Sequence, residues 1–207
     1  MKSFPIKKYN NINDFKNDYF FNLFKTLNKV NSVQLEKISK SILKTIKSKK
    51  KIIICGNGGS ASLANHMLCD FSKNLKENTK LIPKIISLST NIELITAISN
   101  DMSYDKVFSY QAENLCEKKD LIIFFSSSGN SKNLKNLLKL AKKKKCKTVG
   151  FIGFDGGFLK KNCDLSIHCS IDNYGVSEDC NQIIMHLILQ YLKQMQLSKK
   201  NLKKIIF

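Results

Sequence analysis

Residues 51–61 read KIIICGNGGSA, an apolar β-branched run that passes directly into a glycine-rich turn. The run predicts a buried strand, and Ser60 is of a residue type that often begins a helix. Glycines let the backbone approach a ligand closely, and a helix start offers unpaired N–H groups to an anion. The turn lacks the Lys-Ser/Thr ending of a P-loop, and Ala61 replaces the third glycine of the dinucleotide pattern. This stretch therefore favours a phosphorylated ligand other than a nucleotide.

The chain has 207 residues, which is enough for one α/β domain with a sizeable core. Its 43% apolar and 25% charged residues are typical of a soluble globular protein. No apolar run approaches the roughly 18 residues that span a membrane, and residues 1–10 lack the apolar core of a signal peptide. The seven cysteines form no C-x-x-C pair and favour free thiols in a reducing compartment. We therefore expect a cytoplasmic protein that does not bind membranes.

The net charge of +19 comes from 35 lysines against 16 acidic residues, and the chain contains no arginine. Nucleic-acid-binding proteins favour arginine for bidentate contacts to bases and phosphates. Lysines that gather near residues 44–51, 142–147 and 199–204 are typical of solvated helix faces and ends. We therefore expect no nucleic-acid partner, although the charge would attract anionic substrates over a distance.

Two helices are predicted ahead of the first strand, over residues 13–29 and 33–48, with Asn13 as the N-cap of the first. The first helix has an aromatic and apolar face, formed by Phe15, Tyr19, Phe20, Leu23 and Phe24. No strand lies between these helices, so they must pack on another part of the protein. A large exposed apolar face usually marks contact with a partner. We expect residues 1–50 to pack in an oligomer interface.

From residue 51 the sequence alternates between continuous apolar runs and helical patterns. Strands are predicted over residues 52–55, 85–88, 121–125, 148–152 and 165–168. Helices are predicted over residues 60–72, 92–99, 104–116, 132–145, 158–161 and 176–195. This alternation is typical of an α/β protein with a doubly wound, five-stranded parallel sheet of the flavodoxin-like type. The sheet domain is expected over residues 51–195, followed by a lysine-rich, frayed tail over residues 196–207.

Ligands of such sheets bind at the carboxyl ends of the strands, where this chain carries small polar groups. The first strand is followed by the glycine loop that contains Asn57, Gly58, Gly59 and Ser60, and the third by the serine loop 126–131. Hydroxyl and backbone N–H groups can surround a phosphate without a cation. A serine-rich capping turn is the simpler alternative for this loop. The glycine loop at a neighbouring strand end favours the phosphate site.

Two predicted helices carry acidic and histidine side chains at helical spacing. His66 and Asp70 are four residues apart, so they share one helix face and could bind one metal or one substrate. Glu178 and His186 are eight residues apart on the final helix, within about a quarter turn of one another. Surface pairs and core histidines with these spacings are common, so the structural interpretation stays open beside the functional one.

These features occur in a defined order along the chain, together with residues 98–101 (ISND) and 154–157 (FDGG). In this order they resemble the sugar isomerase (SIS) domain family and, within it, the phosphoheptose isomerases. The resemblance covers residues 13–193 and implies a five-stranded parallel α/β sandwich. It also implies a homotetramer with active sites at subunit interfaces, which the two leading helices would help to form.

The activity implied by the resemblance is that of an aldose–ketose isomerase. Such an enzyme converts sedoheptulose 7-phosphate into D-glycero-D-manno-heptose 7-phosphate through an enediol, and the product supplies heptose for lipopolysaccharide or capsule. Two alternatives stay open, a non-enzymatic SIS protein that binds a sugar phosphate or a replication initiator, and an isomerase of another phosphosugar. The carboxylates and histidines favour an enzyme, because a binding module needs no base and acid.

The resemblance also implies roles for individual residues. Sugar contacts fall on Asn57, Gly58, Gly59, Ser60, Asn100, Asp101 and Glu178, and phosphate contacts on Ser126, Ser127, Ser128 and Ser131. Catalytic groups and the ligands of a divalent metal, expected to be zinc, fall on His66, Asp70, Glu178 and His186. Asp70 or Glu178 is expected to act as the base, with His186 as the acid partner. The chain departs from the best-known pattern in having Asp70 in place of Glu and Glu178 in place of Gln.

Overall fold

Five parallel strands form the sheet in the computed structural model, which describes residues 4–205 and residue 207. They are β1 (Lys51–Cys55), β2 (Lys84–Ser87), β3 (Leu121–Ser126), β4 (Lys147–Ile152) and β5 (Leu165–His168), in the order β2-β1-β3-β4-β5. In the register of the central strands, Ile53 lies beside Ile86 on one side and Ile122 on the other. This is the strand order of a flavodoxin-like doubly wound sheet, so the predicted fold class is confirmed.

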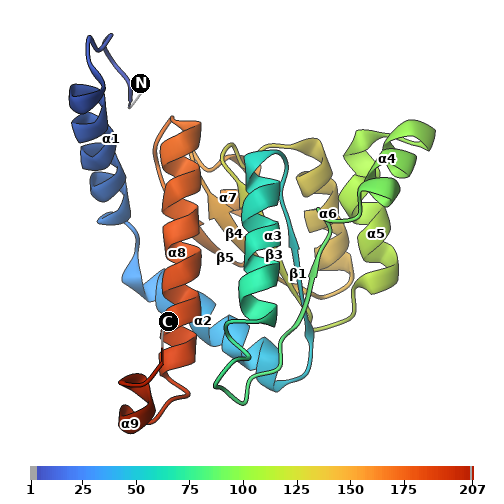
Figure 1. Ribbon diagram of the computed structural model, residues 1–207. Coiled ribbons are helices and arrows are strands. Elements are labelled where there is room, and N and C mark those ends of the chain that lie inside the picture. The colour runs from blue at the N-terminus through green and yellow to red at the C-terminus, as the bar shows by residue number, and fades with distance from the viewer. Residues whose placement is uncertain (1–3, 206) are drawn as a thin grey trace.

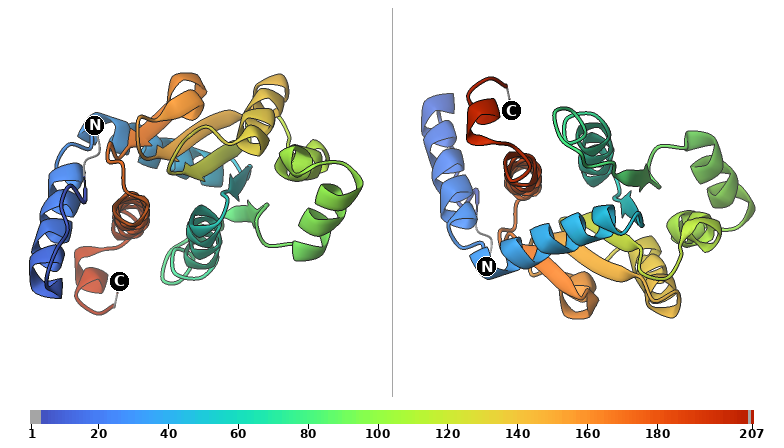
Figure 2. Two further views of the ribbon diagram at one scale, coloured as in Figure 1. Left: turned by 90° about the horizontal axis from the view of Figure 1, so that it is seen from above. Right: turned by 90° about the horizontal axis from the view of Figure 1, so that it is seen from below.

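Helices cover both faces of the sheet (Figures 1 and 2). They are α1 (Ile12–Leu27), α2 (Ser32–Lys47), α3 (Gly59–Ser72), α4 (Ile92–Asp101), α5 (Val107–Leu115), α6 (Lys132–Lys143), α7 (Gly157–Asn162), α8 (Tyr174–Gln194) and α9 (Lys199–Leu202), with a 3₁₀ turn over Tyr104–Lys106. Among the described residues, no helix combines the length and apolar character that crossing a bilayer requires.

Alternate residues of each strand enter two separate cores, because successive strand side chains point to opposite faces. In β1, Ile52 and Ile54 face the core formed with α2, α3 and α8. Ile53 and Cys55 face the second core, formed with α5, α6 and α7. All residues of β3 are buried, because it lies at the centre of a sheet that is covered on both faces. The two cores hold the carboxyl ends of β1 and β3 side by side.

The two leading helices each begin one residue earlier than predicted. The N-cap of α1 is Asn11, whose side chain accepts a hydrogen bond of 2.9 Å from the Asp14 amide, so the prediction of Asn13 is wrong. The N-cap of α2 is Asn31, whose side chain accepts one of 3.1 Å from the Gln34 amide. In each case the cap is an asparagine in extended backbone conformation with its acceptor aimed at the first turn.

The two leading helices also differ in what they pack against. Helix α2 lies on the sheet, and Ile38, Ile42 and Ile46 are at most 4% exposed within the chain's own core. Helix α1 packs along α8 (Figure 1) and leaves Phe20, Phe21 and Phe24 more than half exposed. An apolar face available to a partner is therefore found on α1 and not on α2. The division at residue 50 stays a prediction.

Several element ends shift in ways that matter for the site. Helix α8 begins at Tyr174, two residues earlier than predicted, because Asn173 accepts a 2.9 Å bond from the Val176 amide. Helix α4 runs two residues further than predicted and includes Asp101. The tail that was expected to be frayed contains α9, capped by Ser198.

Candidate active site

A pocket of about 280 Å³ opens at the carboxyl ends of β1 and β3. Strand order reverses between these neighbours, and ligands of open α/β sheets bind at this switch point. The pocket is lined by both polar loops and the start of α8, through Asn57, Gly58, Gly59, Ser60, Phe125, Ser126, Ser127, Ser128, Ser131, Tyr174 and Glu178. The structure thus brings the glycine loop, the serine loop and Glu178 together around one pocket.

The serines of the serine loop differ in what their hydroxyls contact. The Ser126 Oγ accepts a 3.0 Å bond from the Gly129 amide and the Ser128 Oγ a 3.3 Å bond from the Asn130 amide, so both order the turn. Ser127 is 5% exposed, and its Oγ has no hydrogen-bond partner among the described residues. Ser131 precedes α6 without a capping bond from its side chain. An unpaired buried hydroxyl in a polar pocket is a group placed for a ligand.

The Asn57 side chain is held in the pocket wall by two residues that sequence reasoning missed. Its amide exchanges two hydrogen bonds with the Asn133 amide, at 2.9 and 3.0 Å, and the Tyr104 hydroxyl donates to Asn57 Oδ1 at 2.8 Å. Tyr174 was also missed, and its ring packs edge-on against Phe154 with centroids 4.8 Å apart. The wall of the pocket is therefore ordered before any ligand binds.

Glu178 lies directly over the glycine loop. A Cβ built on Gly59 would overlap the Glu178 carboxylate oxygens, so the backbone of the loop and this carboxylate approach one another only because residue 59 is glycine. The pKa of Glu178 is raised, first by its partial burial and second by the negative charge of Asp179. A carboxylate with a raised pKa beside a phosphate pocket is suited to general base chemistry.

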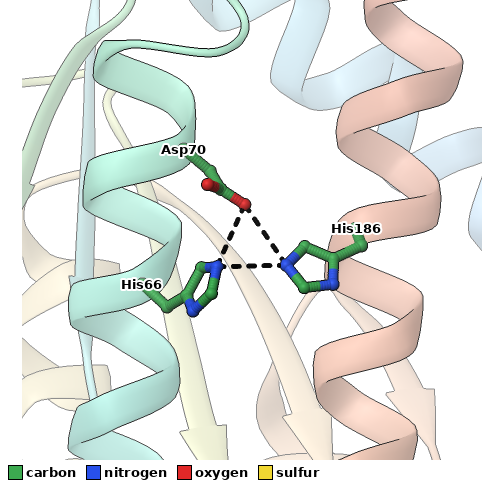
Figure 3. Close-up of side chains that lie close together, drawn as sticks. All are labelled: His66, Asp70 and His186. Carbon is green, nitrogen blue, oxygen red and sulfur yellow. Dashed lines mark hydrogen bonds and ion pairs between the residues drawn. The ribbon is translucent and has the colours of Figure 1, made fainter. Parts of the chain in front are cut away.

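A second group of side chains lies between α3 and α8 (Figure 3). The Nε2 atoms of His66 and His186 are each 3.3 Å from Asp70 Oδ2 and 3.1 Å from one another. Asp70 is 6% exposed, and its other oxygen accepts a 2.9 Å bond from the Asn74 amide. Asn74 therefore orients the carboxylate so that Oδ2 faces both imidazoles.

This cluster fits a divalent metal. His nitrogen and Asp oxygen bind zinc at about 2.0–2.2 Å, and tetrahedral angles then separate two ligand atoms by about 3.3–3.5 Å. The edges of the triangle formed by His66, Asp70 and His186 measure 3.1 to 3.3 Å. Among the described residues, these three form the group of donor atoms close enough to hold one ion.

Within one chain, the structure does not bring two predicted groups of site residues to their expected partners, and their roles stay predictions. Glu178 does not join the metal cluster, because eight residues of α8, about 12 Å along its axis, separate it from His186. Asn100 and Asp101 lie exposed at the end of α4, where the Asn100 amide donates to Asp101 Oδ1 at 2.9 Å. They do not line the pocket. From the chain that follows α4, the Tyr104 hydroxyl contacts Asn57, which lines the pocket.

The fold and the pocket define a doubly wound α/β protein with a polar pocket at the switch point of its sheet. A family model of the SIS domain matches residues 17–153. A phosphoheptose isomerase of Aliarcobacter butzleri is 39% identical over 158 residues, which are 76% of this chain and 83% of the relative. One of Campylobacter concisus is 36% identical over 156 residues, 75% and 82% of the two chains. The chain therefore belongs to the SIS domain family and, within it, to the phosphoheptose isomerases.

Solved structures show the same fold. The phosphoheptose isomerase of Neisseria gonorrhoeae superposes with a TM-score of 0.81 at 23% identity, covering 89% of this chain and all of that one. The enzyme of Francisella tularensis superposes with a TM-score of 0.78 at 23% identity, covering 88% and 96%. These matches extend over most of the sheet and the helices that carry the two groups of side chains.

Proposed function

We propose that the protein is an aldose–ketose isomerase that converts sedoheptulose 7-phosphate into D-glycero-D-manno-heptose 7-phosphate. One observation carries this proposal: a carboxylate with a raised pKa, Glu178, faces a pocket in which the buried hydroxyl of Ser127 has no hydrogen-bond partner among the residues that the structure describes. A phosphate held by the serine loop would position the sugar chain beside that carboxylate. The names of the relatives support the same reaction.

The phosphate would bind at the serine loop and at the start of α6. Ser127 offers its unpaired hydroxyl, and Ser131 a hydroxyl that does not cap the helix. The N-terminus of α6 adds backbone N–H groups and a partial positive charge. Asn57, which Asn133 and Tyr104 hold in place, would hydrogen-bond to the sugar hydroxyls.

Glu178 is the better of the two candidate bases. It lines the pocket, and its pKa is raised. Asp70 is enclosed, because one oxygen accepts from Asn74 and the other faces two imidazoles. In the reaction, Glu178 removes a proton from C1 of the ketose, an enediol forms, and the proton returns to C2 while a hydroxyl proton passes from O1 to O2. The reaction needs no co-reactant, and a base of this kind typically contributes about 10²–10⁴ in rate.

We further propose a homotetramer with active sites at subunit interfaces. Within one chain His186, the predicted acid partner, lies about 12 Å along α8 from Glu178. Its neighbours Ile183, Leu187 and Tyr191 are apolar and 39 to 50% exposed, and α1 adds its exposed phenylalanines. A second copy packed on these surfaces would bring its own His186 closer to a pocket, and we propose that Asn100 and Asp101 contact the sugar in the assembled protein. These three roles stay predictions.

The metal is proposed to be zinc, bound by His66, Asp70 and His186. When bound it would polarise a carbonyl as a Lewis acid.

We also propose that the protein acts in the cytoplasm, where it would supply heptose for lipopolysaccharide or capsule. All seven cysteines are free thiols, which fits a reducing compartment.

The test is turnover of sedoheptulose 7-phosphate by the purified protein, with the product identified by NMR, beside a panel of other phosphosugars. We expect activity on the heptose and a loss of about 10²–10⁴ in kcat for Glu178→Gln. Turnover of a different phosphosugar alone would correct the substrate. Binding of phosphosugars without any turnover would show a non-enzymatic SIS protein.

A further inference from the structure

Tyr174 is a large side chain that lines the pocket and yet remains 66% exposed. It is the first residue of α8 and lies four residues before Glu178, so the two side chains share one face of the helix. An aromatic ring in this position offers a ligand both apolar area and a polar tip. The base and phosphate contacts of the proposed reaction make no use of it.

Phe154, which supports this ring, has an unusual backbone conformation. Its φ of 44° lies in the left-handed region, which a phenylalanine seldom adopts. Such a conformation persists only where the surrounding contacts hold it in place. The Phe154 ring packs edge-on against Tyr174, with centroids 4.8 Å apart and ring planes at 73°. A change in the backbone of Phe154 would therefore move the support of Tyr174.

His168 provides a contact that holds Phe154. It is the last residue of β5, and its Nε2 lies 2.9 Å from the carbonyl oxygen of Phe154. A carbonyl oxygen can only accept, so Nε2 carries the proton and donates it. Burial lowers the pKa of His168, which favours the neutral ring with that single proton. In the sheet His168 lies beside Ile152, so the bond holds the chain where it leaves β4.

The same segment is attached to the serine loop by separate bonds. The Gly153 amide donates to the Ser126 carbonyl oxygen at 3.2 Å, and the Leu159 amide to the Gly129 carbonyl oxygen at 3.0 Å. These backbone bonds do not involve the imidazole. Loss of the His168 side chain should therefore disturb the aromatic wall of the pocket and leave the serine loop in place.

We propose that Tyr174 packs against the carbon chain of the bound sugar phosphate, and that His168 is a positioning residue that acts on Tyr174 through Phe154. The proposal rests on the proposed function, because it requires a sugar phosphate in this pocket. Neither side chain transfers a proton in the reaction. The ring limits the positions that the sugar chain can take beside Glu178, and such orientation contributes to the rate.

The role of Tyr174 is tested by measuring KM for sedoheptulose 7-phosphate together with calorimetric binding of the same sugar. We expect Tyr174→Ala to weaken both by about 10-fold, and Tyr174→Phe, which keeps the ring, to stay within about threefold of the wild type. Tyr110→Ala removes a tyrosine that is 42% exposed on α5 outside the pocket, and it is the matched control. Normal sugar binding in Tyr174→Ala would overturn the proposal.

The role of His168 is tested by a double-mutant cycle. His168→Ala should weaken sugar binding by about 3- to 10-fold, and His168→Gln, whose amide can donate to the same carbonyl, should restore it. In the Tyr174→Ala background, His168→Ala should change sugar binding by less than about twofold, because the residue through which it acts is already gone. Thermal melts verify that each variant folds.

Two results would overturn the role of His168. One is full additivity of the two substitutions, which would show that His168 does not act through Tyr174. The other is weaker binding of inorganic phosphate alone to His168→Ala, which we expect to stay within about twofold of the wild type. Calorimetry needs no turnover, so a wild-type protein that binds the sugar without converting it would refute the proposed reaction and still allow this test.

Discussion

The two ends of α8 contribute to different kinds of site. At its start, Glu178 faces a pocket made of backbone, glycines and short serine side chains at the strand ends. Two turns later, His186 meets a cluster made of long side chains from two packed helices. Sheet topology fixes the first site, because parallel strands place their carboxyl ends at one edge. Helix packing between α3 and α8 fixes the second.

The two sites differ in which of their polar atoms already have hydrogen-bond partners. In the pocket the hydroxyl of Ser127 has no hydrogen-bond partner within the described part of the chain, whereas Asn133 holds the Asn57 side chain in place. In the cluster several polar atoms crowd around one nitrogen of His186. The pocket thus offers groups to an anion, and the cluster offers lone pairs to a cation. Changes confined to one end of α8 should leave the other end intact, and this independence can be tested.

Among the variants that keep Glu178 itself, Gly59→Ala should have the largest effect on the pocket end. The new Cβ would overlap the Glu178 carboxylate and move it away from the sugar. A displacement of about 1 Å at a reacting group can cost about 10²-fold, so we expect kcat to fall by about that factor. Co²⁺ binding at the His66–Asp70–His186 cluster should not change. Gly175→Ala, in which a Cβ meets the Tyr19 hydroxyl at 3.1 Å, is the control, placed on α8, the helix that carries Glu178. Equal losses in both variants would contradict the role of Glu178.

Ser127→Ala and Ser126→Ala should separate substrate binding from loop stability. Ser127→Ala removes an unpaired hydroxyl, so the free energy of unfolding should stay equal or rise, while KM rises by about 10-fold through loss of a bond to the phosphate. Ser126→Ala leaves the buried Gly129 amide without its acceptor and should destabilise the protein by ~1–3 kcal/mol. Thermal melts and steady-state kinetics measure the two effects. An unchanged KM in Ser127→Ala would remove Ser127 from the phosphate site.

The sequence predicted the pocket well because its parts are contiguous. The glycine loop and the serine loop each follow an apolar strand, so their positions depend only on the strand order. Asn133 and Tyr104 could not be found in this way. They meet Asn57 across 76 and 47 residues of sequence, and each is an ordinary polar residue in its own helical segment.

The sequence also could not decide between similar candidates for a helix cap, an interface helix or a shared site. Asn11 and Asn13 are both suitable caps, and only the backbone shows which acceptor faces the first turn of α1. Helices α1 and α2 both carry apolar faces, but α2 lies on the sheet and α1 leaves its phenylalanines exposed. The resemblance groups Glu178 with His186, whereas within one chain the rise of the helix separates them by about 12 Å.

The smallest predicted effect concerns the charge beside the base. Glu178 accepts a proton only when ionised, so kcat/KM should fall as the pH drops through its raised pKa. Burial is the larger cause of that raised pKa, and the charge of Asp179 the smaller. Asp179→Asn removes the charge and should lower the pKa of Glu178, which moves the acid limb of the kcat/KM profile to lower pH. Tyr19→Phe removes the 2.6 Å hydrogen bond to Asp179 but keeps the charge, so its acid limb should not move to lower pH. If the acid limb of Asp179→Asn stays in place, the group that titrates is not Glu178.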